Sequence, residues 1–142
     1  NNFYRAGIGF PEAQFFNRDK KFVDYRESVT DCNGMVSVFL DKVDSINLEI
    51  PVEGKMLDDY LKGVVVEKTG KAFVLEDQDY EVYMIAYWAK FLGKMNKRKI
   101  YDWQERVKKA NQNGKKVRMI LVSTDYQKFW GISKDQIPKF EF

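Results

Sequence analysis

The sequence predicts a protein of the α/β class whose core is a single strand–helix–strand unit. The run Val82–Tyr87 is too continuously apolar for a strand with a solvent-facing side and is typical of a central strand, and Val117–Val122 predicts a second core strand. Residues 94–111 have the period of a helix, with an apolar stripe at spacings of 3, 4 and 3 that is made of Ile100, Trp103, Val107 and Ala110. Asn113 and Gly114 are expected to end this helix. Because the three elements follow one another as a βαβ unit, we expect the two strands to be parallel.

The N-terminal half predicts a β-rich extension, residues 1–70, packed on the core formed by residues 71–142. Residues 1–22 mix glycine and proline with aromatic side chains, which indicates irregular or edge structure. Met35–Leu40 and Ile46–Ile50 predict two short strands, and the second alternates apolar with polar side chains. We expect the two parts to form one compact unit.

Short segments between these elements carry turn and helix signals. Asp31–Gly34 contains Asn-Gly, which tolerates positive φ and predicts a turn. Met56–Leu61 predicts a short helix that ends at Gly63. Val64–Val66 then predicts a buried strand, followed by a turn at Thr69-Gly70.

The composition of the 142 residues favours a folded domain and excludes several kinds of active site. Aromatic residues make up 15% of the chain, and no apolar run approaches the length of a membrane span, about 18 residues. The chain has no histidine, which removes Ser-His and Cys-His catalytic pairs, and its single cysteine, Cys32, cannot form an intrachain disulfide. We therefore expect no enzyme activity, no cofactor and no bound metal ion.

Charge is divided unevenly along the chain. Residues 1–80 carry 10 basic and 15 acidic side chains, net −5, whereas residues 81–142 carry 14 basic and 6 acidic side chains, net +8. A basic run interleaved with aromatic residues can bind a polyanion such as single-stranded nucleic acid. Trp103 belongs to the apolar stripe, however, so the run is interpreted as a solvated helix face and nucleic acid is not the expected partner. The run consists of Lys90, Lys94, Lys97, Arg98 and Lys99.

The end of the first core strand resembles a redox site. The strand that ends at Tyr87 is followed by five residues in a fixed frame: Trp88, Ala89, Phe91, Gly93 and Lys97. On these residues the segment 73–124 resembles the thioredoxin-like superfamily, and it is most similar to the secreted thiol–disulfide oxidoreductase and peroxiredoxin-like branches. The resemblance implies a bacterial domain of the periplasm or cell envelope, and the first residues, Asn-Asn without an apolar leader, are expected of a processed or trimmed product.

Leu92 and Met95 stand where the resemblance places the two cysteines of the redox site. In such a site one thiolate, stabilised at a helix N-terminus, attacks a disulfide, and the second cysteine resolves the mixed disulfide. Leucine has no ionisable atom, and a thioether forms neither a thiolate nor a disulfide. The resemblance therefore implies the fold without its dithiol chemistry, with both side chains expected to be packing residues.

The C-terminal segment carries a further part of the resemblance. Ile137-Pro138 is similar to the segment that leads to the family's cis-proline, and a cis and a trans bond are both left open. Only four residues follow Pro138, so the family's last strand and helix are missing. Either an N-terminal element completes the sheet, or the domain is truncated or differently wired.

The leading functional hypothesis is a redox-inactive thioredoxin-like domain that binds a protein or peptide partner. The groove implied by the resemblance surrounds the two substituted positions and is made of Trp88, Phe91, Gly93, Ile137 and Pro138. One alternative is a structural or accessory interaction domain of an unrelated α/β fold from a bacterial envelope protein, and a third hypothesis is a polyanion-binding module.

Overall fold

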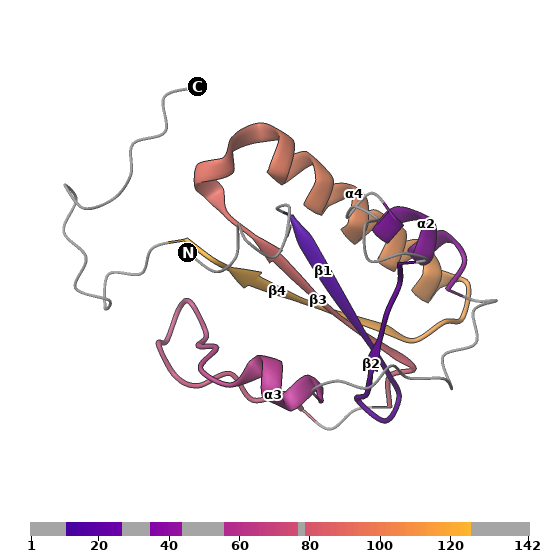
Figure 1. Ribbon diagram of the computed structural model, residues 1–142, viewed down its shortest axis with the longest axis horizontal. Helices are drawn as coiled ribbons and strands as arrows, with labels where there is room; N and C mark the ends of the chain where they lie inside the picture. Colours follow the sequence, from indigo (N-terminus) through magenta and orange to yellow (C-terminus); the bar gives the residue numbers. More distant parts are fainter. Residues whose placement is uncertain (1–10, 27–34, 44–55, 77–78, 126–142) are drawn as a thin grey trace.

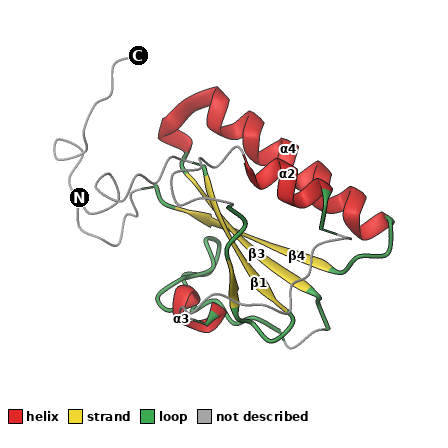
Figure 2. Cartoon of the chain, turned by 45° about the vertical axis from the view of Figure 1, so that its right-hand side comes forward, coloured by secondary structure: helices red, strands yellow, loops and turns green. Residues whose placement is uncertain are grey.

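The computed structural model of the chain describes residues 11–26, 35–43, 56–76 and 79–125. Within these ranges four strands form one mixed sheet in the order β2-β1-β3-β4. Helices α2 and α4 cover one face of the sheet and α3 lies against the other, which confirms the α/β class (Figure 1; Figure 2). In chain order the elements are β1 (Glu12–Asn17), β2 (Phe22–Val23), α2 (Met35–Asp41), α3 (Leu57–Leu61), β3 (Val82–Trp88), the 3-10 helix η1 (Lys90–Leu92), α4 (Gly93–Gln112) and β4 (Val117–Ser123).

The βαβ unit expected from the sequence is present. Strands β3 and β4 are adjacent and parallel, with a register that runs from Val82 opposite Val117 to Trp88 opposite Ser123. Helix α4 connects them and ends just before Gly114, whose φ of 94° is the left-handed conformation that favours glycine. All four residues of the predicted apolar stripe are buried on α4.

Strand β1 lies in the interior of the sheet, which corrects the expectation of irregular or edge structure for residues 1–22. It pairs antiparallel with β3 on one side and with β2 on the other. Ala13, Phe15 and Phe16 of this strand are fully buried, and they reach the cores on both faces of the sheet. Pro11 precedes the strand and so does not interrupt it. An N-terminal strand is thus part of the described sheet.

Residues 35–41 form helix α2, so the prediction of a strand over Met35–Leu40 is wrong. Val36, Phe39 and Leu40 are buried at helical spacing, and Val43 continues the same face after the helix ends. The β-branched and aromatic composition favoured a strand, but the helical period of the buried positions decides the local structure.

Helix α2 is held against α4 by a small polar network. Arg106 on α4 pairs with Asp41 on α2 and also with Asp102, one turn back on its own helix, at 3.0 Å. The hydroxyl of Ser37 on α2 donates to Asp102 at 3.0 Å. The Arg106 guanidinium is the main reason that the pKa of Asp102 lies below its usual value, with a smaller contribution from Ser37. The network fixes the orientation of the two helices more than it stabilises them, because its charges are partly exposed.

The segment after α3 agrees with part of its prediction. Helix α3 and its end at Gly63, with φ of 80°, are as expected, and so is the turn at Thr69-Gly70. The prediction of a buried strand over Val64–Val66 is wrong, because pairing there is limited to one bridge, Val65 with Ala72. The turn at Thr69-Gly70 follows Val66 so closely that the two segments cannot pair over more residues.

Two apolar layers fill the spaces above and below the sheet. Val82, Met84 and Ala86 point toward α2 and α4, whereas Tyr83 and Ile85 point toward α3. This alternation along β3 explains its continuous apolar character, since both of its faces are covered. Several segments of the sequence analysis lie outside the described residues: Asp31–Gly34 with Cys32, Ile46–Ile50 and Ile137-Pro138.

Candidate functional site

The carboxyl ends of the parallel strands β3 and β4 meet at one edge of the sheet, where Trp88 lies beside Ser123. The carbonyl oxygen of Trp88 accepts two hydrogen bonds from Thr124, one from its backbone N–H at 2.8 Å and one from its hydroxyl at 3.0 Å. In α/β proteins this edge is the usual place for a ligand. The two bonds fix the backbone around Trp88 on both strands.

Asp125 connects this strand end to the entrance of α4. Its carboxylate accepts hydrogen bonds from the backbone N–H of Lys90 and from the hydroxyl of Ser123, both at 2.8 Å. The ammonium group of Lys90 lies 3.5 Å from a carboxylate oxygen of Glu67 and 6.0 Å from the centre of the Trp88 ring. A charged rim therefore borders the tryptophan.

A cleft of about 560 Å³ opens on the α3 side of this edge. One wall is β4 and the other is the segment 63–67 that follows α3. Its lining is mainly apolar and consists of Gly63, Val64, Val65, Val66, Glu67, Phe73, Trp88, Arg118, Met119, Ile120, Leu121, Val122 and Ser123. The sequence indicated Trp88 as a groove residue. It did not indicate the wall formed by β4, because that wall exists only if β4 is the outermost strand of the sheet.

Leu92 and Met95, which the resemblance places at the two cysteine positions, lie at the start of α4 and do not line this cleft. Leu92 is the N-cap residue of the helix, and Gly93 has φ of 77° and ψ of −161°. Met95 is 86% exposed, so the expectation that it is a packing residue is wrong. The first inward-facing side chain of helix α4 is that of Asn96, one position after Met95. Of the groove residues implied by the resemblance, Trp88 lines the cleft, Gly93 does not, and Ile137, Pro138 and the Phe91 side chain lie outside the described residues.

Asn96 is the inward-facing residue that the sequence did not single out. It is 4% exposed, and its Oδ1 accepts a hydrogen bond from the backbone N–H of Ala89 at 3.3 Å. Its Nδ2 has no hydrogen-bond partner among the described residues. Asn96 thus braces the connection from Trp88 into α4 and is a structural residue of the site.

Two titratable groups, Glu12 at the start of β1 and Tyr87 opposite it on β3, lie at the same end of the sheet. Burial raises the pKa of Glu12, although the Tyr25 hydroxyl donates to its carboxylate at 2.9 Å and opposes the rise. Burial, helped by the nearby Tyr60, raises the pKa of Tyr87 to about 12. The Tyr87 hydroxyl donates to Gln14 at 3.1 Å. Both tyrosines therefore act as neutral hydrogen-bond donors.

The basic run has a different character from the cleft. Lys94, Lys97 and Arg98 are exposed on the first turns of α4, and the Lys97 ammonium lies 5.6 Å from the centre of the Tyr101 ring. Trp103 is fully buried, as the apolar stripe predicted, so it is unavailable for stacking on a base. This arrangement agrees with the interpretation of the run as a solvated helix face.

Together these features define an α/β protein with an apolar cleft at the carboxyl end of a mixed four-stranded sheet. Comparisons of the chain with models of protein families, with curated proteins and with solved structures found no match. Among the described helices, none combines the length and the apolar character that crossing a membrane requires. Over the same ranges, no three acidic or cysteine side chains gather in a way that could hold a metal ion.

Proposed function

We propose that this chain is a redox-inactive, thioredoxin-like domain of the bacterial periplasm or cell envelope that binds a peptide segment of a partner protein beside Trp88. The observation that carries the proposal is the cleft itself. It is mainly apolar, it runs along β4 up to the carboxyl end of the sheet at Trp88 and Ser123, where α/β proteins hold ligands, and its volume of about 560 Å³ accommodates several side chains.

The walls of the cleft favour a peptide over a small polar molecule. Valine side chains of residues 64–66 face Ile120 and Val122 of β4 across it, and Phe73 and Trp88 add aromatic surface. Polar groups are confined to Arg118, the Lys90–Glu67 rim and the strand end. An apolar trough with a charged rim matches the general anatomy of protein interfaces.

The chemistry at the start of α4 supports binding without catalysis. The positions of Leu92 and Met95 supply no thiolate, and the exposed thioether of Met95 cannot resolve a mixed disulfide. A peptide would therefore be held and released unchanged.

Selection of a random heptapeptide display library on the folded chain tests the proposal. The selected peptides are then synthesised with a fluorophore and titrated by anisotropy against two variants. Val66→Glu places a charge in the wall of the cleft, at a residue that is 38% exposed, whereas Val74→Glu makes the same change at a residue that is 77% exposed and does not line the cleft. We expect Val66→Glu to weaken binding at least tenfold and Val74→Glu to leave it within twofold. Equal effects of the two substitutions, or no selectable peptide, would contradict the proposal.

Insulin disulfide reduction tests the redox-inactive part separately. We expect no turnover above the rate of free dithiothreitol, for the chain and for Cys32→Ser alike. Turnover retained in Cys32→Ser would show that the chain supports thiol chemistry and would refute this part.

A further inference from the structure

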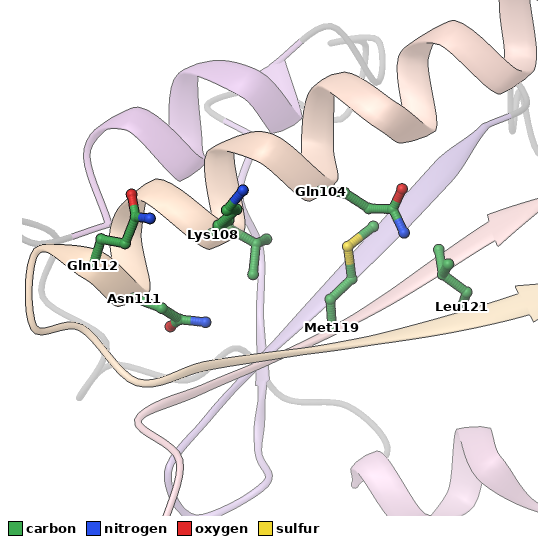
Figure 3. A pocket seen from close by; sticks show the side chains of 7 residues that line it. Gln104, Lys108, Asn111, Gln112, Met119 and Leu121 are labelled. Atoms are coloured by element: carbon green, nitrogen blue, oxygen red, sulfur yellow. The ribbon is translucent and has the colours of Figure 1, made fainter.

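Strand β4 is the last strand of the sheet within the described ranges, and a cavity lies on each side of its outer edge. The first cavity is the cleft on the α3 side. The second, of about 490 Å³, lies between β4 and α4, where Gln104 points toward Met119 and Leu121 (Figure 3). Met119 and Leu121 line both cavities, so the two cavities meet along this edge.

The hydrogen bonds at both ends of β4 fix which backbone groups point outward. The carbonyl of Lys116 accepts from Val82 and the N–H of Thr124 donates to Trp88, so the even-numbered residues of β4 face β3. Val117 instead exchanges both of its backbone hydrogen bonds with the side chain of Asn111. Since the direction alternates along a strand, the N–H and C=O groups of Met119 and Leu121 point away from the sheet.

We propose that β4 binds its peptide by strand addition, with main-chain hydrogen bonds to Met119 and Leu121. This inference rests on the proposed function and names the binding mode of the same site. A strand laid along this edge sends alternate side chains to opposite faces of the sheet. Each of the two cavities then receives every second side chain, which is the arrangement that gives strand addition its sequence specificity.

The chemistry of the two cavities selects the peptide. The α3-side cleft, with Val66, Val122 and Trp88 among its walls, takes apolar side chains. The α4-side cavity adds Lys108 and the amides of Gln104 and Gln112 to an apolar lining of Val107, Met119 and Leu121, and Lys108 forms no ion pair within the described ranges. An acidic side chain fits there by charge. The expected ligand is therefore an extended segment in which an acidic residue stands between two apolar ones.

The probe for this inference is a blocked, fluorescein-labelled peptide, Ser-Leu-Glu-Leu-Ser, titrated by anisotropy. Two modified versions of this peptide, called its twins, each carry one N-methyl group. In one twin the methyl group is on the backbone nitrogen of the glutamate, and in the other it is on that of the second leucine. Because adjacent N–H groups of an added strand point in opposite directions, only one of the two twins loses a hydrogen bond to β4. We expect that twin to bind about tenfold more weakly and the other within twofold. Equal binding by both twins and the parent, or an equal loss in both twins, would overturn strand addition.

Charge reversal tests the α4-side cavity. Lys108→Glu is compared with Lys109→Glu, its neighbour on the helix, which carries the same charge but does not line the cavity. We expect Lys108→Glu to weaken the glutamate peptide about fivefold and to strengthen its lysine twin, Ser-Leu-Lys-Leu-Ser, with no such exchange for Lys109→Glu. Identical behaviour of the two variants would overturn the assignment of the acidic residue to this cavity.

A proline on the outer edge separates this inference from the proposed function. Leu121→Pro removes an outward N–H that the sheet does not use, so the fold is expected to survive. If library peptides remain sensitive to Val66→Glu but not to Leu121→Pro, the proposed function stands and strand addition fails. Sedimentation that shows a dimer dissociated by Leu121→Pro, together with no peptide binding, would assign the edge to a second copy and overturn the inference.

Discussion

The side chain of Asn111, at the end of α4, pairs with the backbone of Val117 as a neighbouring strand would. Its Oδ1 accepts from the Val117 N–H at 2.7 Å, and its Nδ2 donates to the Val117 carbonyl at 3.0 Å. The start of the β4 edge is thereby closed, and the next outward-facing groups belong to Met119. One side chain thus sets where a peptide strand can begin to pair.

Replacing Asn111 by alanine is expected to lower the free energy of unfolding by about 1–3 kcal/mol, because the backbone N–H and C=O of Val117, a buried residue, both lose their hydrogen bonds. Urea unfolding measures the change. Gln112→Ala is the matched control, since its exposed side chain forms no hydrogen bond within the described ranges, and its effect should stay within about 0.5 kcal/mol. A loss of equal size in both variants would mean that the Asn111 bonds contribute nothing specific.

The backbone at Gly93 predicts a cost for any side chain there. With φ of 77° and ψ of −161°, Gly93 adopts a conformation that is close to exclusive to glycine, although a Cβ would meet no atom within 4 Å. Gly93→Ala should lower the free energy of unfolding by about 1–3 kcal/mol through backbone strain alone.

Gly70→Ala provides the comparison for Gly93→Ala. Its φ of 65° is left-handed and its surroundings are equally open, so it should cost only about 1 kcal/mol. Denaturant unfolding of the two variants side by side is the measurement. A neutral Gly93→Ala would show that the entrance to α4 has a different backbone in solution.

Trp103 is fully buried, and its ring N–H has no hydrogen-bond partner among the described residues. Trp103→Ala should destabilise by about 3–5 kcal/mol, as large-to-small core substitutions do. Trp103→Phe should cost much less, because it keeps most of the ring and removes an N–H whose burial is unfavourable. Thermal and urea unfolding of Trp103→Ala and Trp103→Phe measure the two changes in stability. Equal losses of stability in the two variants would show that the ring N–H has a partner.

The raised pKa of Glu12 predicts a pH dependence of stability. Between the ordinary glutamate pKa of 4.5 and its higher pKa in the folded state, Glu12 binds more protons in the folded chain than in the unfolded chain. The free energy of unfolding should therefore fall as the pH rises through this window and level off above it. Glu12→Gln should remove that slope and be the more stable chain at neutral pH.

Tyr25→Phe tests the cause of the Glu12 shift. The Tyr25 hydroxyl lowers the pKa that burial raises, so its removal should move the same slope to higher pH. Urea unfolding at a series of pH values follows both variants. Persistence of the slope in Glu12→Gln would assign the pH dependence to another group.

The βαβ unit was predictable because β3 is covered on both of its faces and α4 on one, and because β4 keeps an apolar run although Arg118 and Leu121 are exposed. Val82–Tyr87 lacks polar alternation for that reason, and the stripe that includes Trp103 has a clean helical period. Helix α2 was not predicted, because β-branched and aromatic residues favour a strand by composition. The prediction did not consider the helical spacing of the apolar positions. That spacing was present in the sequence.

The candidate site was predictable only where a residue type carries the information. The replacement of both expected cysteines by Leu92 and Met95 rules out dithiol exchange there from the sequence alone. The exposure of Met95 and the burial of Asn96 depend on how α4 is rotated at its first turn, which packing against β3 and β4 decides. The position of β4 at the side of the sheet depends on the pairing of β1 with β3, a contact between residues far apart in the chain.

The most direct test of peptide binding at the β4 edge is amide hydrogen exchange, followed by NMR, with and without the Ser-Leu-Glu-Leu-Ser peptide. We expect the outward N–H groups of Met119 and Leu121 to become protected on binding, while the exchange of the Met95 N–H is unchanged. Protection at Leu92 and Met95 with no change at Met119 and Leu121 would contradict it and would place the ligand at the entrance to α4.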